Sequence, residues 1–254
     1  MKNRIKILFI LIMITFSSAF AQEFKLAKST GRLEINIGRA TIQGYDGNEI
    51  IFTSADYEKD KDERAKGLKE INSLGLDDNT GLGINVTSTG EVVTVRQLKK
   101  TNSPKIKIQV PKGMIISYSH ESQYGGEVSF RNLENEIEVS VQYNSVELEN
   151  CNGPVTIKTI YGHVEGVFEP TTKGPISIVS VYGYVDVSIP TATKANLKLS
   201  TSHGQIYVAP DFKIDINKQG DMVRYSDNLN GKINGGGMNV DLNCSYGKVY
   251  LRKK

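Results

Sequence analysis

The second half of the chain carries a segment that returns about every 20 residues, and this period restricts the folds open to it. The copies have forms such as Ser122-Gln-Tyr-Gly125 and Ser180-Val-Tyr-Gly183. Their aromatic positions are Tyr124, Tyr143, Tyr161, Tyr182, His203, Tyr225 and Tyr246. A fixed period of this length is typical of stacked repeats, in which each unit buries its apolar face only against its neighbours.

The apolar residues within each repeat alternate along the chain, as they do in β-strands. In one copy Ile176, Ile178 and Ser180 precede the aromatic residue, and Val185 and Val187 follow it. We expect these positions to face inward in every copy, on two short strands joined at the aromatic corner. The glycine at that corner is expected to supply a positive φ. A second corner is predicted at Asn152-Gly-Pro154, Lys173-Gly-Pro175 and Asn230-Gly231.

Stacked coils place equivalent side chains one above another, so the seven aromatic residues are expected to form a ladder in chain order. The first half shows the same alternation with looser spacing. A charged segment, 57–80, interrupts it and is expected to be an excursion formed by a short helix or a loop. The predicted fold is all-β: a right-handed, single-stranded β-solenoid (β-helix) with coils of about 20 residues.

The first 21 residues have the pattern of an export signal. Three basic residues precede a short apolar run, and an Ala-x-Ala cleavage pattern ends at Ala21. The apolar run is shorter than the roughly 20 residues of a spanning helix. We therefore expect one exported domain, 22–254, in the periplasm or at the cell surface. Without the signal, 28 basic residues face 28 acidic ones, so the charge gives no support for nucleic-acid binding.

The two cysteines, Cys151 and Cys244, are predicted to be isolated thiols. They lie 93 residues apart, between four and five coils. At roughly 4.8 Å per stacked strand the sequence places them about 20 Å apart. A disulfide tolerates a Cα separation of only about 7 Å.

Three segments and the repeated unit together resemble a known family. They are Gly31-Arg-Leu-Glu-Ile-Asn-Ile-Gly38, Glu63-Arg-Ala-Lys-Gly-Leu68, Asp78-Asn-Thr-Gly-Leu-Gly83 and the Tyr-Gly-x-Val units. The chain is similar over its mature length to the bacterial β-strand-repeat domains named putative adhesins, which are common in exported proteins of Bacteroidetes-type bacteria. The resemblance implies a right-handed β-solenoid in a single domain. It carries over no catalytic residues.

The aromatic ladder and the outward sheet face next to it supply the candidate binding residues. Stacked exposed aromatics can bind sugar rings, and a long face suits a polymer. The alternative is that the tyrosines cover the end of the core and reach water through their hydroxyl groups. The candidates are Tyr161, Tyr182, Tyr184, His203, Tyr207 and Tyr246, and further outward residues are Gln205, Lys248 and Tyr250.

The polar residues favour structural roles over chemistry. Four acids occupy nearly the same phase on successive coils, namely Glu127, Glu147, Glu165 and Asp186. Such a row could bind calcium or raise one carboxyl pKa, but outward positions of strands also produce it. The histidines, His120, His163 and His203, are expected to be structural or solvated. The segment Asp77-Asp-Asn-Thr-Gly81 is predicted to form a turn rather than a calcium loop.

These patterns predict a non-enzymatic, exported protein of the cell envelope, adhesin-like in its binding or structural role. No cofactor or metal is expected; the sequence does not identify the partner, and a cell-surface glycan or an envelope protein are the candidates. The alternatives are a polysaccharide-active β-helix enzyme and a periplasmic accessory to envelope-stress signalling. Edge-to-edge self-association is a secondary expectation, because an open last strand invites pairing. Residues 22–30 and the tail Arg252-Lys-Lys254 are expected to guard the two ends.

Overall fold

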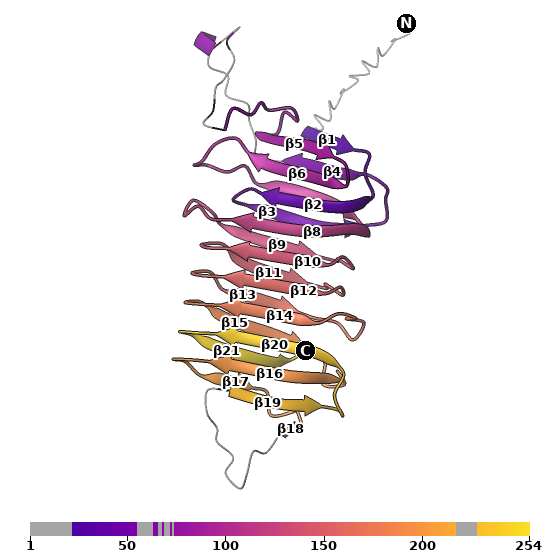
Figure 1. Ribbon diagram of the computed structural model, residues 1–254, viewed down its shortest axis with the longest axis vertical. Coiled ribbons are helices and arrows are strands. Elements are labelled where there is room, and N and C mark those ends of the chain that lie inside the picture. The colour runs from indigo at the N-terminus through magenta and orange to yellow at the C-terminus, as the bar shows by residue number, and fades with distance from the viewer. Residues whose placement is uncertain (1–21, 55–62, 66–67, 69–71, 73, 217–227) are drawn as a thin grey trace, which may run out of the picture.

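The computed structural model describes residues 22–54, 63–65, 68, 72, 74–216 and 228–254. These residues form 21 strands in two mixed sheets. The strands lie across the long axis of the molecule, one above another, and we call two successive strands, one from each sheet, a rung (Figure 1). The all-β prediction is confirmed. The predicted export signal, residues 1–21, lies outside the described residues.

Each sheet is open, with two edge strands. Sheet A has ten strands in the order β1 (Gln22–Leu26), β4 (Ile50–Ser54), β7 (Ile106–Pro111), β3 (Ala40–Tyr45), β9 (Glu127–Arg131), β11 (Ser145–Glu149), β13 (Val164–Val167), β15 (Tyr184–Ile189), β21 (Lys248–Lys253) and β17 (Ile206–Val208). Sheet B has eleven in the order β18 (Ile214–Ile216), β19 (Asn228–Ile233), β16 (Ala195–Thr201), β20 (Met238–Cys244), β14 (Ile176–Ser180), β12 (Val155–Thr159), β10 (Ile137–Val141), β8 (Gly113–His120), β2 (Thr30–Asn36), β6 (Val92–Gln97) and β5 (Ile84–Thr89). A 3-10 helix spans Glu63–Ala65, within the charged segment.

The strands from β8 to β15 form the regular middle of the stack. Successive strands alternate between sheet B and sheet A, and each pairs in parallel with the strand after next. The five inward positions predicted for one repeat, from Ile176 to Val187, are buried. Residues at the same phase lie in register, as Ile157 does with Ile178. The winding of these strands as a right-handed solenoid stays a prediction.

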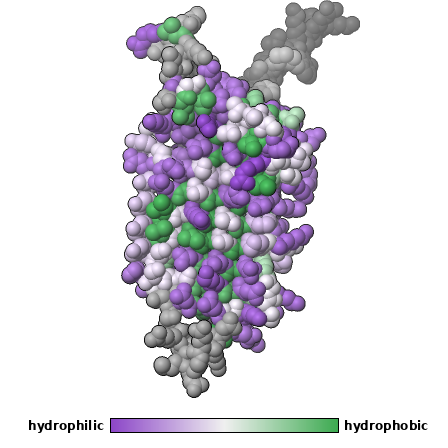
Figure 2. Space-filling model, viewed as in Figure 1, coloured by the Kyte–Doolittle hydropathy of each residue, from purple (hydrophilic) through white to green (hydrophobic). Residues whose placement is uncertain are grey.

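The outward positions of the same strands are mainly polar, which is the pattern of a sheet with one solvated face. Figure 2 shows the result on one side of the molecule, where hydrophilic residues line both flanks and hydrophobic residues are visible between them. The two sheets therefore share an apolar interior and present polar outer faces.

The order of the rungs at both ends departs from chain order, and here the sequence prediction was wrong. Strands β20 and β21 lie between β14/β15 and β16/β17, so the last rung of the chain is inserted one place inside the stack. Strands β2 and β3 are inserted in the same way between β6/β7 and β8/β9. In Figure 1 the C-terminus accordingly lies beside β20 and not at the end of the stack.

The guards of the stack ends are therefore not those expected at the C-terminus. Arg252 and Lys253 belong to β21, which is paired on both sides. Three of the four edge strands are added in antiparallel fashion, β1 on β4, β5 on β6 and β18 on β19, while the short edge strand β17 pairs in parallel with β21. At the N-terminal end, β1 does form an edge of sheet A, and its charged residues Glu23 and Lys25 form an ion pair there.

The glycines of the aromatic corner are required for close approach and not for a positive φ. None of them is among the described glycines with a positive φ, which contradicts the expectation from sequence. A Cβ on Gly183 would lie 2.1 Å from the Gly162 carbonyl oxygen, and one on Gly247 would lie 1.9 Å from that of Gly183. At these two corners backbone packs against backbone, with no room for a Cβ.

Both cysteines are buried free thiols, as predicted. The count of four to five coils between them was wrong, because β20 lies only two strands from β12 in sheet B. The two thiols are kept apart by lying at opposite corners: Cys151 precedes β12, whereas Cys244 ends β20. Burial raises the pKa of the Cys151 thiol to about 12.

Candidate functional site

Five aromatic residues stack at the corner between the two sheets and form what we call the aromatic column. Its order is Tyr143, Tyr161, Tyr182, Tyr246 and His203. Successive ring centroids are 5.0, 5.3, 5.0 and 4.9 Å apart. The interplanar angles are between 5° and 19°, so the rings lie nearly parallel. Tyr246 stands between Tyr182 and His203 because its rung is inserted there.

The column is held in place by the backbone of the corner. The amide N–H of Tyr161 donates to the carbonyl of Gln142. In the same way the amide N–H groups of Tyr182 and Tyr246 donate to the carbonyls of Ile160 and Val181, each at 2.8 Å. Behind the rings, Thr159, Ser180 and Thr201 turn their hydroxyl groups inward and donate to backbone carbonyls of the neighbouring rung. These ties fix both the height and the direction of each ring.

The position of Cys244 is equivalent to that of the three hydroxyl residues, and its thiol donates to the Gly183 carbonyl. At the same place in β8 stands His120, which is buried. Its Nδ1 lies 2.9 Å from Oδ1 of Asn144, whose amide group donates to two backbone carbonyls. The Asn144 oxygen must then accept, so His120 donates from Nδ1. His120 is thus buried and held by Asn144, while its Nε2 has no hydrogen-bond partner among the described residues.

Two members of the predicted ladder are not in the column. Tyr225 lies outside the described residues. Tyr124 is exposed and makes no ring contact with any described residue. The connection from β8 to β9 is three residues longer than that from β10 to β11, counted between the inward positions His120 and Val128 and the positions Val141 and Val146. The longer loop carries Tyr124 out of the stack.

The column presents ring edges and hydroxyl groups to solvent. Its four tyrosines are between 42% and 54% exposed. Because the rings are parallel and in contact, the faces of the inner rings are covered by their neighbours. An aromatic edge carries partial positive charge and the hydroxyl group both donates and accepts hydrogen bonds. The exposed line can therefore contact polar groups at intervals of about 5 Å, the spacing of the rungs.

A second aromatic group lies on the outer face of sheet A, next to the column. His163 stacks on Tyr184 at 4.6 Å, and Tyr207 stacks on Tyr250 at 5.3 Å. Tyr184 and Tyr250 meet edge to face at 6.4 Å. Two cations lie over these rings: Lys248 is 5.8 Å from the Tyr207 centroid, and Arg252 is 5.0 Å from that of Tyr250. This face combines aromatic surface with positive charge.

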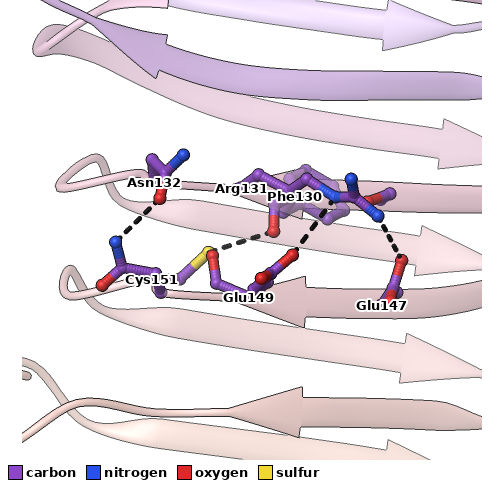
Figure 3. Close-up of polar contacts among 8 residues, drawn as sticks. Phe130, Arg131, Asn132, Glu147, Glu149 and Cys151 are labelled. Carbon is purple, nitrogen blue, oxygen red and sulfur yellow. Dashed lines mark hydrogen bonds and ion pairs between the residues drawn. The ribbon is translucent and has the colours of Figure 1, made fainter.

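The predicted row of acids is present on sheet A, but its carboxylates already have ion-pair or hydrogen-bond partners. Glu147, Glu165 and Asp186 lie in register on adjacent strands, while Glu127 is in register with Ser145 and so falls outside the row. Figure 3 shows Arg131 of β9 reaching Glu147 and Glu149 of β11, at 3.2 and 3.5 Å. Asp186 forms a two-pronged ion pair with Arg252.

The third acid of the row, Glu165, accepts a hydrogen bond from the Tyr184 hydroxyl group. This bond, with some desolvation, raises the pKa of Tyr184 to about 12. Each acid of the row thus has a partner on a neighbouring strand or residue. Among the described residues no group of three or more His, Cys, Asp or Glu side chains is arranged to hold a metal ion.

The predicted turn at 77–81 is confirmed. The Asp78 carboxylate accepts hydrogen bonds from the backbone N–H groups of Thr80, Gly81 and Gly83. Its oxygens are therefore used within the turn.

The structure brings the predicted binding residues together in two neighbouring sets. Tyr161, Tyr182, Tyr246 and His203 belong to the column, while Tyr184 and Tyr207 both contact Tyr250 on sheet A. Sequence reasoning missed the cations over two rings of the second set, Lys248 over Tyr207 and Arg252 over Tyr250. The signal was present, since Lys248 and Arg252 alternate with Tyr250 along the last strand.

Comparison with known proteins gives no family assignment. No family model and no curated protein matches the chain. A structure of a putative cell adhesion protein from Clostridium sporogenes is similar with a TM-score of 0.45 and 12% identity, over 92% of this chain and 100% of that one. A putative adhesin from Bacteroides fragilis has a TM-score of 0.34 and 13% identity, over 93% and 98%. Likenesses this remote carry no argument about this chain.

In the part of the chain that the structure describes, no helix has the length and apolarity needed to span a bilayer.

Proposed function

We propose that the protein is a non-enzymatic, exported binding module of the cell envelope that acts as an adhesin-like receptor for a cell-surface glycan. The observation that carries this proposal is the aromatic column, a continuous line of five exposed rings. The architecture proposed with it is a right-handed β-solenoid forming one domain. The alternation of β8 to β15 between the two sheets, with parallel pairing to the strand after next, supports that winding.

The geometry of the column decides how a glycan would bind. A sugar cannot stack on the inner rings, whose faces are covered, but its hydroxyl groups can bond to the tyrosine hydroxyl groups along the line. At the two ends, Tyr143 and His203 each have a single stacked ring among the described residues. Those terminal rings can offer one face to a sugar ring. An extended polysaccharide lying along the column therefore fits better than a short sugar standing on it.

The outer face of sheet A extends this surface. Tyr207 is 47% exposed, lies on the edge strand β17, and has one ring neighbour among the described residues. Lys248 is in register with Tyr184 on the adjacent strand. A glycan chain that crosses the corner would meet aromatic faces and cations here, which supports a role for Tyr184 and Tyr207 in the same surface.

The ion pairs and hydrogen bonds of the carboxylates on sheet A support a binding role and not glycan hydrolysis. A glycosidase uses a pair of carboxyl groups, one of them with a raised pKa. Here the in-register acids bind Arg131, Arg252 and the Tyr184 hydroxyl group across strands. They hold the face of sheet A together.

The test is a binding assay of the mature chain against a panel of extended polysaccharides, with point variants of the column. We expect Tyr182→Ala to abolish retention of the protein on the immobilised glycan, because it removes the central ring of the column. Tyr182→Phe separates the two contributions, since it keeps the ring stacking but removes the hydroxyl group. Tyr124→Ala is the matched control: this tyrosine is 51% exposed at an equivalent corner but is not stacked.

Equal retention by the Tyr182→Ala and Tyr124→Ala variants would overturn the column as the binding surface. Localisation is tested separately by protease shaving of intact cells beside a periplasmic control. Loss of the protein while the control survives supports surface adhesion. Protection until the outer membrane is permeabilised would contradict it.

A further inference from the structure

A groove of about 840 Å³ lies on the outer face of sheet B, and it shares no lining residue with the aromatic column. Its floor consists of the outward residues of three adjacent strands, β6, β2 and β8. Its walls come from the connections after β6 and β8, which contribute Leu98 to Lys100 and Glu121 to Ser122, and from Leu74 of the charged segment. Both connections are longer than the corners of the middle rungs, since β7 begins only at Ile106 and β9 only at Glu127. The long loops therefore enclose what is elsewhere a flat face.

The floor of the groove is a grid of polar groups with one cation, Arg96, and one acid, Glu34. Arg96 is in register with Asn36, whose amide donates to the Ser119 hydroxyl group at 3.5 Å. One position along, Thr94, Glu34 and Ser117 lie side by side on the same three strands. Neighbouring strands are about 4.8 Å apart, so the distance from one strand to the next is roughly the width of a sugar ring.

The charge of the groove is the second part of the argument. Arg96 and Lys100 are exposed, and neither forms an ion pair with any described residue. Lys99 adds a third cation to the wall. Of the two acids, Glu34 lies 3.8 Å from Arg32, which also pairs with Glu138. Glu121 is at the opposite wall. The groove thus holds two unpaired cations, in contrast to sheet A, where Arg131 and Arg252 are matched by acids.

We propose that this groove is a second binding site, specific for an acidic oligosaccharide of a few residues. Arg96 and Lys100 would bind its carboxylate or sulfate groups, and Asn36, Ser117 and Ser119 would bond to its hydroxyl groups. An Arg guanidinium binds a planar carboxylate with two parallel hydrogen bonds, which a lone lysine cannot do. The volume lies within the range of small-molecule sites. The site does not depend on the aromatic column, so either can fail without the other.

The experiment is calorimetric titration of the mature chain with a tetrasaccharide of galacturonic acid, a sulfated tetrasaccharide, a neutral β-glucan tetrasaccharide and inorganic phosphate. We expect an acidic tetrasaccharide to bind and the neutral one not to. Arg96→Gln and Lys100→Gln should each weaken binding about tenfold, the size of one lost charge-assisted hydrogen bond. Glu121→Gln should strengthen binding, because it removes from the wall a negative charge that repels the acidic sugar.

The matched control is Lys158→Gln. Lys158 is an exposed, unpaired cation on the same outer face, on β12, and it does not line the groove. If Lys158→Gln weakens binding as much as Arg96→Gln, the effect is general surface charge and the proposal is overturned. Equal affinity for acidic and neutral sugars would also overturn it. Binding of phosphate that displaces the acidic tetrasaccharide mole for mole would reduce the site to a simple anion site, which again contradicts an oligosaccharide groove.

Discussion

From β8 to β15 the rungs of this protein follow chain order and pair only in parallel, whereas at both ends a rung from a chain terminus is inserted between two others. The two regions share the same inward positions and the same corner chemistry. What differs is the order of the strands. The comparison indicates that the repeat specifies which face each residue takes, while the order of rungs is decided by the pairing needs of the stack ends.

The insertion gives each terminal rung two partners. Strand β21 pairs with β15 and β17, and β20 pairs with β14 and β16. A rung placed last in the stack would have one edge open, and open edges promote association with other chains. The outermost places are taken instead by short or antiparallel strands. The C-terminal strands are thereby held inside the stack, whereas the N-terminal strand β1 remains an edge of sheet A.

The largest expected effect tests whether the inserted rung is as well packed as the middle. Leu242 of β20 and Ile178 of β14 are in register and fully buried. We expect Leu242→Ala and Ile178→Ala each to lower the free energy of unfolding by about 2–5 kcal/mol, because both leave a cavity. Urea denaturation gives both values. Leu229, on the outer strand β19, is only partly buried and is the control, with a smaller expected loss.

A cost for Leu242→Ala as small as that for Leu229→Ala would mean that β20 and β21 are loosely held. The insertion would then not protect the chain end. The middle and the C-terminal end would then differ in packing as well as in strand order.

The next effect concerns the corner glycines of the two regions. A Cβ on Gly183 would lie 2.1 Å from the Gly162 carbonyl oxygen, and one on Gly247 would lie 1.9 Å from the Gly183 carbonyl oxygen. We expect Gly183→Ala and Gly247→Ala each to cost about 1–3 kcal/mol through overpacking. Gly90 has a positive φ and open space around it, so Gly90→Ala should cost only about 1 kcal/mol, from backbone strain. Thermal and urea unfolding measure all three.

A smaller effect is expected from the ion pairs that hold each region. Arg252 of the inserted β21 bonds to Asp186, and Arg131 of the middle bonds to Glu147. Because both arginine side chains are about half exposed to solvent, Arg252→Gln and Arg131→Gln should each cost roughly 0.2–1 kcal/mol. The loss should shrink further in high salt, which screens the wild-type pair. A large, salt-independent loss for Arg252→Gln alone would show that packing of Arg252 on Tyr250 dominates.

Much of this arrangement could be predicted from the sequence, because it follows from local periodicity. The inward positions around Tyr182 and the stacking of equivalent tyrosines depend only on strand alternation and a constant period. The insertion of β20 could not be predicted in this way, since Tyr246 has the same local pattern wherever its rung lies in the stack. The role of Gly183 was misjudged because close backbone approach and positive φ select the same residue. The groove beside Arg96 has no repeated signal, and loop lengths alone hint at it.

The smallest expected effect is a pH dependence where the two regions meet. Tyr184 of β15 donates to Glu165 of the middle and contacts Tyr250 of the inserted rung. Its pKa is raised to about 12 in the folded protein, first by the hydrogen bond to Glu165, against an unfolded value of 10.0. The folded state therefore holds this proton more tightly, and its contribution to stability is complete below pH 10 and is lost as the pH rises toward 12. Tyr184→Phe should remove this slope and one high-pH step in the ultraviolet titration of the tyrosines. If the wild type and Tyr184→Phe lose stability in parallel between pH 10 and 12, the hydrogen bond across β13 and β15 contributes nothing to holding the inserted rung against the middle.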